Sequence, residues 1–177
     1  MPFFALTCHP STPCAAVRHV QVDALRNDNE LWLRYSLEGD IAALRLPESG
    51  PPRRDDGLWR HTCFEAFLKC RPGAADYREF NFAPSRAWAA YHFDAYREGI
   101  AVVELEPPAI VVLRGRRLLE LDVRVKLDGL ALNDADSRLG LSAVIEDNAG
   151  GLSYWACAHA PGKPDFHHPG SFICPLA

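Results

Sequence analysis

Apolar and polar residues alternate along most of this chain, and the alternation predicts β-strands. In residues 119–127, every odd position holds leucine or valine and every even position holds a charged residue. In residues 30–38, three leucines and a tyrosine alternate with polar residues and a tryptophan. A helix, with about 3.6 residues per turn, would mix the two groups around its surface, whereas a strand sends them to opposite faces. Both segments are therefore predicted to be strands with one buried face.

Shorter runs of the same kind predict further strands, and the segments between them are rich in proline and glycine, which favour loops. The Arg-Gly-Arg-Arg sequence at 114–117 predicts the turn of a hairpin that joins a strand at 109–113 to the strand at 119–127. Residues 128–138 favour a short helical turn. So many short strands predict an all-β fold, an antiparallel β-sandwich similar to a jelly roll. The remaining predicted strands span residues 17–24, 41–46, 62–70, 77–83, 87–96, 139–146 and 153–158.

The composition is that of a globular protein. The chain of 177 residues is 48% apolar and 24% charged, which predicts one domain over residues 1–177 with its own core. Because the net charge is -4 and most basic residues are scattered, we expect no nucleic-acid partner. The N-terminus lacks the pattern of a secretion signal and no segment has the length of a membrane span, so we expect a cytoplasmic protein without a membrane partner. Six cysteines without a C-x-x-C pair are expected to be buried thiols.

Two predicted strands that follow each other in the chain carry polar side chains on what we expect to be one face. In residues 62–70, Glu65 points away from the phenylalanine, alanine and leucine at even positions. In residues 77–83, Glu79 and Asn81 point away from two phenylalanines. If the phenylalanines fill the core, the three polar side chains form a platform open to solvent. The alternative is that they are ordinary residues of a solvated sheet face.

Aromatic residues near this platform suit a sugar ligand. The C–H face of a sugar ring packs on tryptophan or tyrosine, while carboxylates and amides bind its hydroxyl groups. The strand predicted at 87–96 sends Trp88 to one side and Tyr91 to the other, and Trp59 precedes the first glutamate by six positions. We expect such a ring to border the platform. The alternative is that the tryptophans pack in the core or at its rim.

The C-terminal segment holds a second group of candidates. Asp165 with His159, His167 and His168 could supply oxygen and nitrogen ligands for a transition metal, but their spacing matches no established metal motif. Asp165 and His167 also form a candidate general-base pair, although the chain contains no nucleophile motif such as G-x-S-x-G. The alternative is a loop that closes over a sheet end, with the histidine rings bonded to main-chain carbonyls.

Four motifs together resemble the bacterial DOMON-like proteins, which are related to the family-9 carbohydrate-binding modules. The resemblance covers nearly the whole chain and implies a β-sandwich with a ligand site on its concave sheet. The motifs are L-W-x-x-T-C-F-E-x-F at 58–67, Y-x-E-x-N-F-x-P-S-x-x-W at 77–88, S-Y-W-A at 153–156 and P-D-F-H at 164–167.

The resemblance also implies roles for single residues. In the family-9 modules, two tryptophans hold the sugar, and a glutamate and an arginine-x-asparagine pair bond to it. By similarity, the tryptophan, glutamate and asparagine roles fall on Trp59, Glu65 and Asn81, whereas Glu79 stands where those modules have the arginine. The resemblance leaves three candidates for the second tryptophan, which are Trp155, Phe166 and Tyr91.

These observations predict a protein that binds a small polar ligand such as a saccharide, with no required cofactor and no catalysis. An enzyme stays open as an alternative, with Glu65 and Glu79, or Asp165 and His167, processing a sugar. The exposed face could instead bind a protein partner or a second copy of the chain. The residues predicted to bind the ligand are Trp59, Glu65, Glu79, Asn81, Trp88, Tyr91, Trp155, Asp165 and His167.

A bound haem or divalent metal is the remaining alternative. The DOMON superfamily includes haem proteins that use methionine with histidine or lysine, and the only methionine of this chain is Met1. Two histidines would then have to hold the haem. The candidates for such a pair are His61, His92, His159, His167 and His168.

Overall fold

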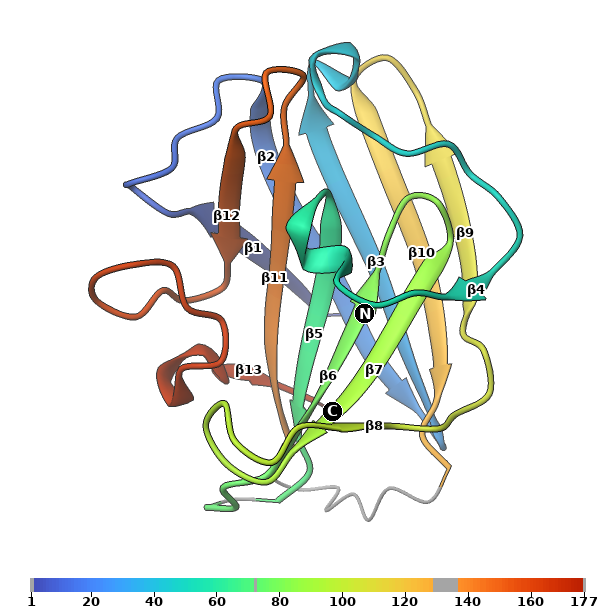
Figure 1. Ribbon diagram of the computed structural model, residues 1–177, viewed down its shortest axis with the longest axis vertical. Coiled ribbons are helices and arrows are strands. Elements are labelled where there is room, and N and C mark those ends of the chain that lie inside the picture. The colour runs from blue at the N-terminus through green and yellow to red at the C-terminus, as the bar shows by residue number, and fades with distance from the viewer. Residues whose placement is uncertain (1, 72, 129–136, 177) are drawn as a thin grey trace.

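β-Strands make up nearly all of the regular structure in the computed structural model, which describes residues 2–71, 73–128 and 137–176. They form two curled sheets, one behind the other in Figure 1, so the predicted antiparallel β-sandwich is confirmed. Sheet A contains, in spatial order, β2 (Val17–Asn27), β3 (Glu30–Gly39), β10 (Leu118–Lys126) and β9 (Ala109–Arg114). Sheet B contains, in spatial order, β7 (Ala87–Phe93), β6 (Tyr77–Phe82), β5 (Cys63–Lys69), β11 (Arg138–Glu146) and β12 (Leu152–Ala156).

Short elements complete the two sheets. Two of them, β4 (Arg53–Arg54) and β8 (Ala101–Val102), pair with β7, and β13 (Cys174–Pro175) pairs with β11. None of the helical segments among the described residues approaches the length and apolarity that crossing a membrane requires. The described part of the chain contains three 3-10 turns, which are η1 (Ile41–Ala43), η2 (Leu58–Arg60) and η3 (Pro169–Ser171).

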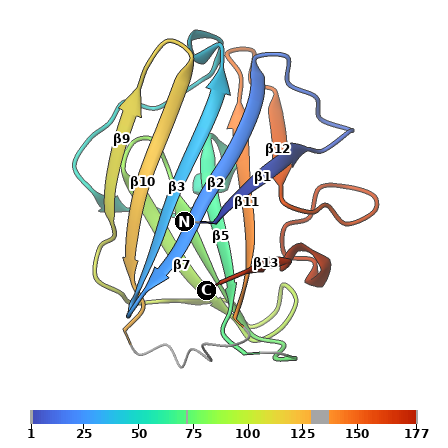
Figure 2. The ribbon, with the colours of Figure 1, turned by 180° about the vertical axis from the view of Figure 1, so that it is seen from behind.

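The N-terminal strand β1 (Phe3–Cys8) joins the two sheets. Its first residues, from Phe3 to Leu6, pair with β2 in sheet A, and Thr7 and Cys8 pair with β12 in sheet B. Seen from behind in Figure 2, β1 runs obliquely from one sheet to the other. Main-chain hydrogen bonds therefore close the sandwich on this side, which leaves neither β2 nor β12 as an unpaired edge.

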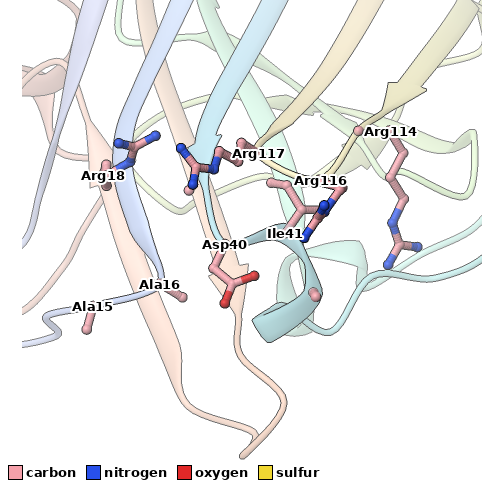
Figure 3. A pocket seen from close by; sticks show the side chains of 11 residues that line it. Ala15, Ala16, Arg18, Asp40, Ile41, Arg114, Arg116 and Arg117 are labelled. Atoms are coloured by element: carbon pink, nitrogen blue, oxygen red, sulfur yellow. The ribbon is translucent and has the colours of Figure 1, made fainter.

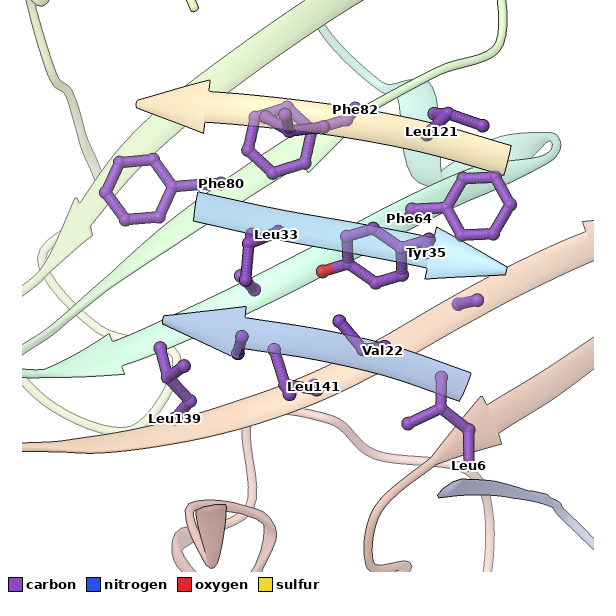
Figure 4. Packing of buried hydrophobic residues seen from close by; sticks show 14 of the residues in the cluster. Leu6, Val22, Leu33, Tyr35, Phe64, Phe80, Phe82, Leu121, Leu139 and Leu141 are labelled. Atoms are coloured by element: carbon purple, nitrogen blue, oxygen red, sulfur yellow. The ribbon is translucent and has the colours of Figure 1, made fainter. Parts of the chain in front are cut away.

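Alternate side chains of both sheets fill the space between them. Figure 4 shows this packing, in which Val22 of sheet A and Leu141 of sheet B are fully buried. Tyr35 of β3 lies in the same layer, with its ring centroid 5.1 Å from that of Phe64. Its hydroxyl donates to the main-chain carbonyl of Glu65 at 2.9 Å. This buried hydrogen bond fixes how β3 lies across β5.

The outer face of sheet B is also covered by apolar side chains. Phe67, Tyr77 and Phe93 project from the strands and pack beneath Phe166 and Phe172 of the C-terminal segment 157–173. The rings of Tyr77 and Phe93 stack with centroids 4.8 Å apart. Sheet B is therefore buried on both faces, which explains why six consecutive residues of β5 are buried.

Most predicted strands are confirmed, and the predicted hairpin turn at 114–117 is closed by a hydrogen bond from the Gly115 amide to the Leu118 carbonyl at 2.8 Å. The strand predicted at 87–96 ends earlier, at Phe93, because the next residues form a tight turn in which the amide of Asp94 bonds to the carbonyl of Glu98. Strands β1, β4, β8 and β13 were not predicted, because they are short or lack alternation. The helical turn predicted at 128–138 lies mostly outside the described residues.

The strand predicted at 41–46 is wrong. Its first three residues form η1, and only Leu44 makes an isolated bridge, with Asp147. Ile41 and Leu44 are buried because the chain folds over the end of the sandwich here, with the Asp40 amide bonded to the Ala16 carbonyl at 2.8 Å. These two residues are apolar because they are buried at a turn, and not because they alternate along a strand.

Gly39, at the end of β3, lies very close to the main chain of Ala16, just before β2. A Cβ atom on Gly39 would lie 2.1 Å from the main-chain oxygen of Ala16, whereas the atom nearest to a Cβ on Gly50 is 3.9 Å away. Because a main-chain carbonyl cannot rotate aside, we expect Gly39→Ala to lower the free energy of unfolding by about 2 kcal/mol or more. Gly50→Ala should change it by less than about 1 kcal/mol. Urea unfolding measures both, and equal effects would contradict the close approach.

Candidate functional site

A cleft of about 550 Å³ opens on the outer face of sheet B, within the covering apolar layer. Its floor consists of side chains from β5, β6, β7, β11 and β12. Its rim consists of η2, the loop 94–100 after β7 and the C-terminal segment 157–173, which surround the centre of sheet B in Figure 1. The volume is that of a typical site for a small molecule. Segments far apart in the sequence thus build one cavity.

Two carboxyl groups form the polar part of the floor. Glu65 on β5 is in register with Asn81 on β6, and Phe67 is in register with Glu79, so the two glutamates occupy diagonal positions on one face. They are only 2% and 5% exposed. The Asn81 amide donates to Glu79 Oε1 at 2.7 Å, and the Ser142 hydroxyl donates to Glu65 Oε2 at 3.4 Å. Few hydrogen bonds therefore replace the water that these carboxyl groups have lost.

This arrangement holds a proton in the cleft. Burial, and then the charge of Glu79, raise the pKa of Glu65 well above its usual value. Burial raises the pKa of Glu79 to about 7, although the hydrogen bond from Asn81 and the charge of Arg97 act in the opposite direction. Two neighbouring carboxyl groups in such a place do not both ionise readily. Near neutral pH the pair therefore offers both an O–H donor and acceptor oxygens.

Asp165 and His167 do not form a side-chain pair. The Nδ1 atom of His167 lies 2.8 Å from the Tyr77 hydroxyl, and its Nε2 atom lies 3.7 Å from Glu79 Oε2. Asp165 instead accepts from the Arg97 guanidinium at 2.8 Å and from the main-chain amide of His167 at 3.1 Å. Burial, with a contribution from the charge of Arg97, lowers the pKa of His167 to about 4, so its ring is neutral at neutral pH. Asp165 thus holds Arg97 at the rim.

Aromatic rings border the floor. The Tyr91 hydroxyl donates to Asp56 Oδ1 at 2.6 Å, and burial raises the pKa of Tyr91, so the group stays protonated. Trp59 of η2 is 50% exposed, and the Arg60 guanidinium lies 5.2 Å from its ring centroid. A large half-exposed ring at the mouth of a cleft is available to pack on a ligand.

Five of the nine residues predicted to bind the ligand line the cleft, and four do not. Asn81 is buried beside the floor, where its Oδ1 atom has no hydrogen-bond partner among the described residues, and Asp165 lies behind the rim. Trp88 and Trp155 point into the core between the sheets, which corrects the expectation that they border the polar residues. The five that line the cleft are Trp59, Glu65, Glu79, Tyr91 and His167.

The polar platform also differs from the prediction. Glu65, Glu79 and Asn81 do share one face, but each is no more than 5% exposed, so the platform is not open to solvent. The reason is the apolar cover, in which Phe166 and Phe172 pack over sheet B. Of the three, Glu65 and Glu79 face the cleft, and Asn81 is buried beside it.

Sequence reasoning missed several residues that loops bring to the cleft. Asp56, Arg97 and Ile100 lie outside the strands that face it, where periodicity carries no information. Tyr154 did carry a signal, because it alternates with Trp155 on β12. Once Trp155 is assigned to the core, Tyr154 must face the cleft.

Within residues 2–71, 73–128 and 137–176, no three histidine, cysteine or carboxylate side chains are grouped as a metal ion requires. Of the histidines considered for haem, His61 and His92 each lie beside a carboxylate, and His159 lies beside a main-chain carbonyl. All six cysteines are free thiols, and three of them are buried.

No protein-family model matches this sequence, and no curated protein sequence matches it. Solved structures that resemble it include a protein from Bacteroides uniformis ATCC 8492 proposed to bind carbohydrate, with a TM-score of 0.70, 16% identity, and coverage of 97% of this chain and 84% of that one. A family 9 carbohydrate-binding module from Caldicellulosiruptor kristjanssonii in complex with glucose has a TM-score of 0.51, 10% identity, and coverage of 81% and 69%. The complex of such a module from the same organism with cellotriose has a TM-score of 0.51, 9% identity, and coverage of 86% and 75%. At these identities the similarity establishes a shared fold.

The raised pKa of Glu79 makes stability depend on pH. Folded Glu79 keeps its proton up to about pH 7, whereas unfolded glutamate loses it near pH 4.5, so the folded state binds more protons in this window and the free energy of unfolding falls as pH rises. His167 opposes this slope between about pH 4 and pH 6.5. We expect Glu79→Gln to remove the Glu79 contribution. The melting temperature of the variant minus that of the parent should then increase by several degrees between about pH 5 and about pH 8, because only the parent loses the Glu79 contribution.

Thermal unfolding across this pH range measures the effect. Glu120→Gln, on the outer face of sheet A, is the matched control, because it removes a carboxyl group and leaves Glu79 in place. If the melting temperature of Glu79→Gln relative to the parent did not change with pH, the floor of the cleft would hold no buried proton.

Proposed function

We propose that this chain binds a saccharide in the cleft on the outer face of sheet B. One observation carries the proposal: two buried carboxyl groups, from Glu65 and Glu79, lie at the floor of a cleft whose mouth holds the half-exposed ring of Trp59. A sugar matches both parts, since its C–H faces pack on aromatic rings and its hydroxyl groups both donate and accept hydrogen bonds.

The proton that this carboxyl pair keeps near neutral pH makes the floor suited to hydroxyl groups. The ionised carboxylate accepts from one sugar hydroxyl, while the protonated carboxyl donates to another. Arg97, held by Asp165 at the rim, adds donors for ring or linkage oxygens. Because the floor groups are already desolvated, a hydroxyl group that reaches them replaces few water contacts.

The fold supports the same ligand class. Similar sandwiches occur in the family 9 modules in complex with glucose and cellotriose and in the Bacteroides uniformis protein proposed to bind carbohydrate. The motif resemblance assigns Trp59 and Glu65 to sugar contacts, and both line the cleft.

The charge of the cleft limits which saccharides it can bind. Asp56, Glu65 and Glu79 line it together with Arg97, whose charge is offset by Asp165 just behind the rim. The cleft therefore favours neutral or positively charged sugars and repels sugar acids. Since the resemblance puts an arginine where this chain has Glu79, we propose a selectivity different from that of the family-9 modules.

Sugar hydrolysis is the second candidate, and the raised pKa values favour it. A carboxyl pair that shares one proton supplies the acid and the carboxylate that glycosidases use. Incubation with cellotriose decides between the two candidates. Binding without release of glucose supports the binding function, whereas release that Glu65→Gln abolishes supports hydrolysis.

Calorimetric titration with glucose, cellotriose, glucosamine and glucuronic acid tests the binding function. We expect Trp59→Ala and Glu65→Gln each to weaken binding of the best ligand by about tenfold or more, because they remove the packing surface and the hydroxyl acceptor. Trp32→Ala is the matched control for the first variant, since Trp32 lies on sheet A beneath the Arg124 guanidinium.

Binding that Trp32→Ala weakens as strongly as Trp59→Ala would contradict the assignment of the cleft. So would the absence of binding to all four sugars by a folded protein. Glucuronic acid as the tightest ligand would contradict the proposed charge selectivity alone.

A further inference from the structure

A second cavity, of about 650 Å³, lies at the end of the sandwich where β3 ends and the β9–β10 hairpin turns. Figure 3 shows its lining, which includes Arg18, Arg114, Arg116 and Arg117 together with Asp40. These residues come from the start of β2, from the hairpin turn and from the segment before η1. None of the residues that line it lines the cleft on sheet B.

Main-chain contacts hold the frame of this cavity. The Gly39 amide donates to the Arg117 carbonyl at 3.0 Å, and the Asp40 amide donates to the Ala16 carbonyl at 2.8 Å. The approach is so close that a Cβ atom on Gly39 would lie 2.1 Å from the Ala16 oxygen. The three segments are thus fixed by their backbones, and the arginine side chains are not needed to hold them.

The arginines of this cavity differ from the others in the chain. Within the described part of the structure, Arg18, Arg114, Arg116 and Arg117 have no hydrogen bond, ion pair or ring contact from their side chains. Every other arginine makes at least one such contact, as Arg34 does with Asp122 at 2.6 Å. The other arginines whose side chains make such a contact are Arg26, Arg45, Arg53, Arg54, Arg60, Arg71, Arg78, Arg86, Arg97, Arg124 and Arg138.

The net charge of the cavity is opposite in sign to that of the whole chain. Four arginines and Asp40 give it a formal charge of +3, while the chain carries -4. Asp40 offsets only one of the four positive charges, so the arginines repel each other, and an anion would relieve that repulsion. The hairpin turn is closed by a main-chain hydrogen bond from Gly115 to Leu118, so turn geometry does not account for three arginines there.

We propose that this cavity binds a small molecule with two or more phosphate or sulfate groups. The planar guanidinium fork matches the oxygens of such groups and bonds to them in pairs. The volume suits a small ligand, and four arginines at one end of an acidic chain are too few for an extended nucleic-acid track. Asp40 is placed to accept from a hydroxyl group of the same ligand.

Calorimetric titration of the full chain with pyrophosphate and with a disulfated disaccharide, at about 0.15 M salt, tests the proposal. We expect at least one probe to bind, and Arg116→Gln with Arg117→Gln to weaken that binding about tenfold or more. Only the main chains of these arginines hold the frame and their side chains repel each other, so the melting temperature should not fall. A tighter pyrophosphate complex assigns phosphate as the ligand group, and a tighter disulfate complex assigns sulfate.

The control double variant is Arg53→Gln with Arg71→Gln, which removes the same charge from exposed arginines outside the cavity. It should leave binding within about twofold of the parent. Equal weakening by both double variants would overturn the proposal, because overall charge would then explain the binding. So would the absence of binding to either probe at about 10 mM by the folded parent.

Discussion

Two carboxyl groups are held together where water can hardly solvate them, and the candidate site follows from this constraint. The strand register brings Glu65 and Glu79 to one face of sheet B, and the C-terminal segment then covers that face with phenylalanines. Hydrogen bonds from Asn81 and Ser142 only partly replace water. A pair with one group protonated avoids two buried charges, and it gives the cleft both a donor and an acceptor.

The protein has two cavities of different chemical character, and they lie in different parts of the sandwich. The cleft on sheet B joins an acidic floor to aromatic rings, which suits the hydroxyl groups and C–H faces of a saccharide. The cavity at the end of the sandwich gathers four arginines that have no side-chain partner among the described residues, which suits oxyanions. Both cavities are framed by main-chain hydrogen bonds of the sandwich, so side chains in either can vary without unfolding the sheets.

The strand period in the sequence predicts which residues share a face, because it does not depend on what packs there. It therefore grouped Glu65 with Glu79 correctly. It cannot tell which face is inside when both are apolar, as on sheet B, and for this reason the period makes Trp88 a ligand candidate although it packs in the core. Trp155, also in the core, is a candidate only through the motif resemblance. Arg97 lies in a turn without any period, and the cover over sheet B comes from the irregular segment 157–173.

With Glu65 and Glu79 buried side by side on one face, the floor of the cleft holds a proton at neutral pH. A pH titration of the two carboxyl carbons by ¹³C NMR measures whether it does. The structure predicts two coupled steps, with one carboxyl group still protonated near about pH 7. Ionisation of both groups near the ordinary glutamate value of about 4.3 would contradict it.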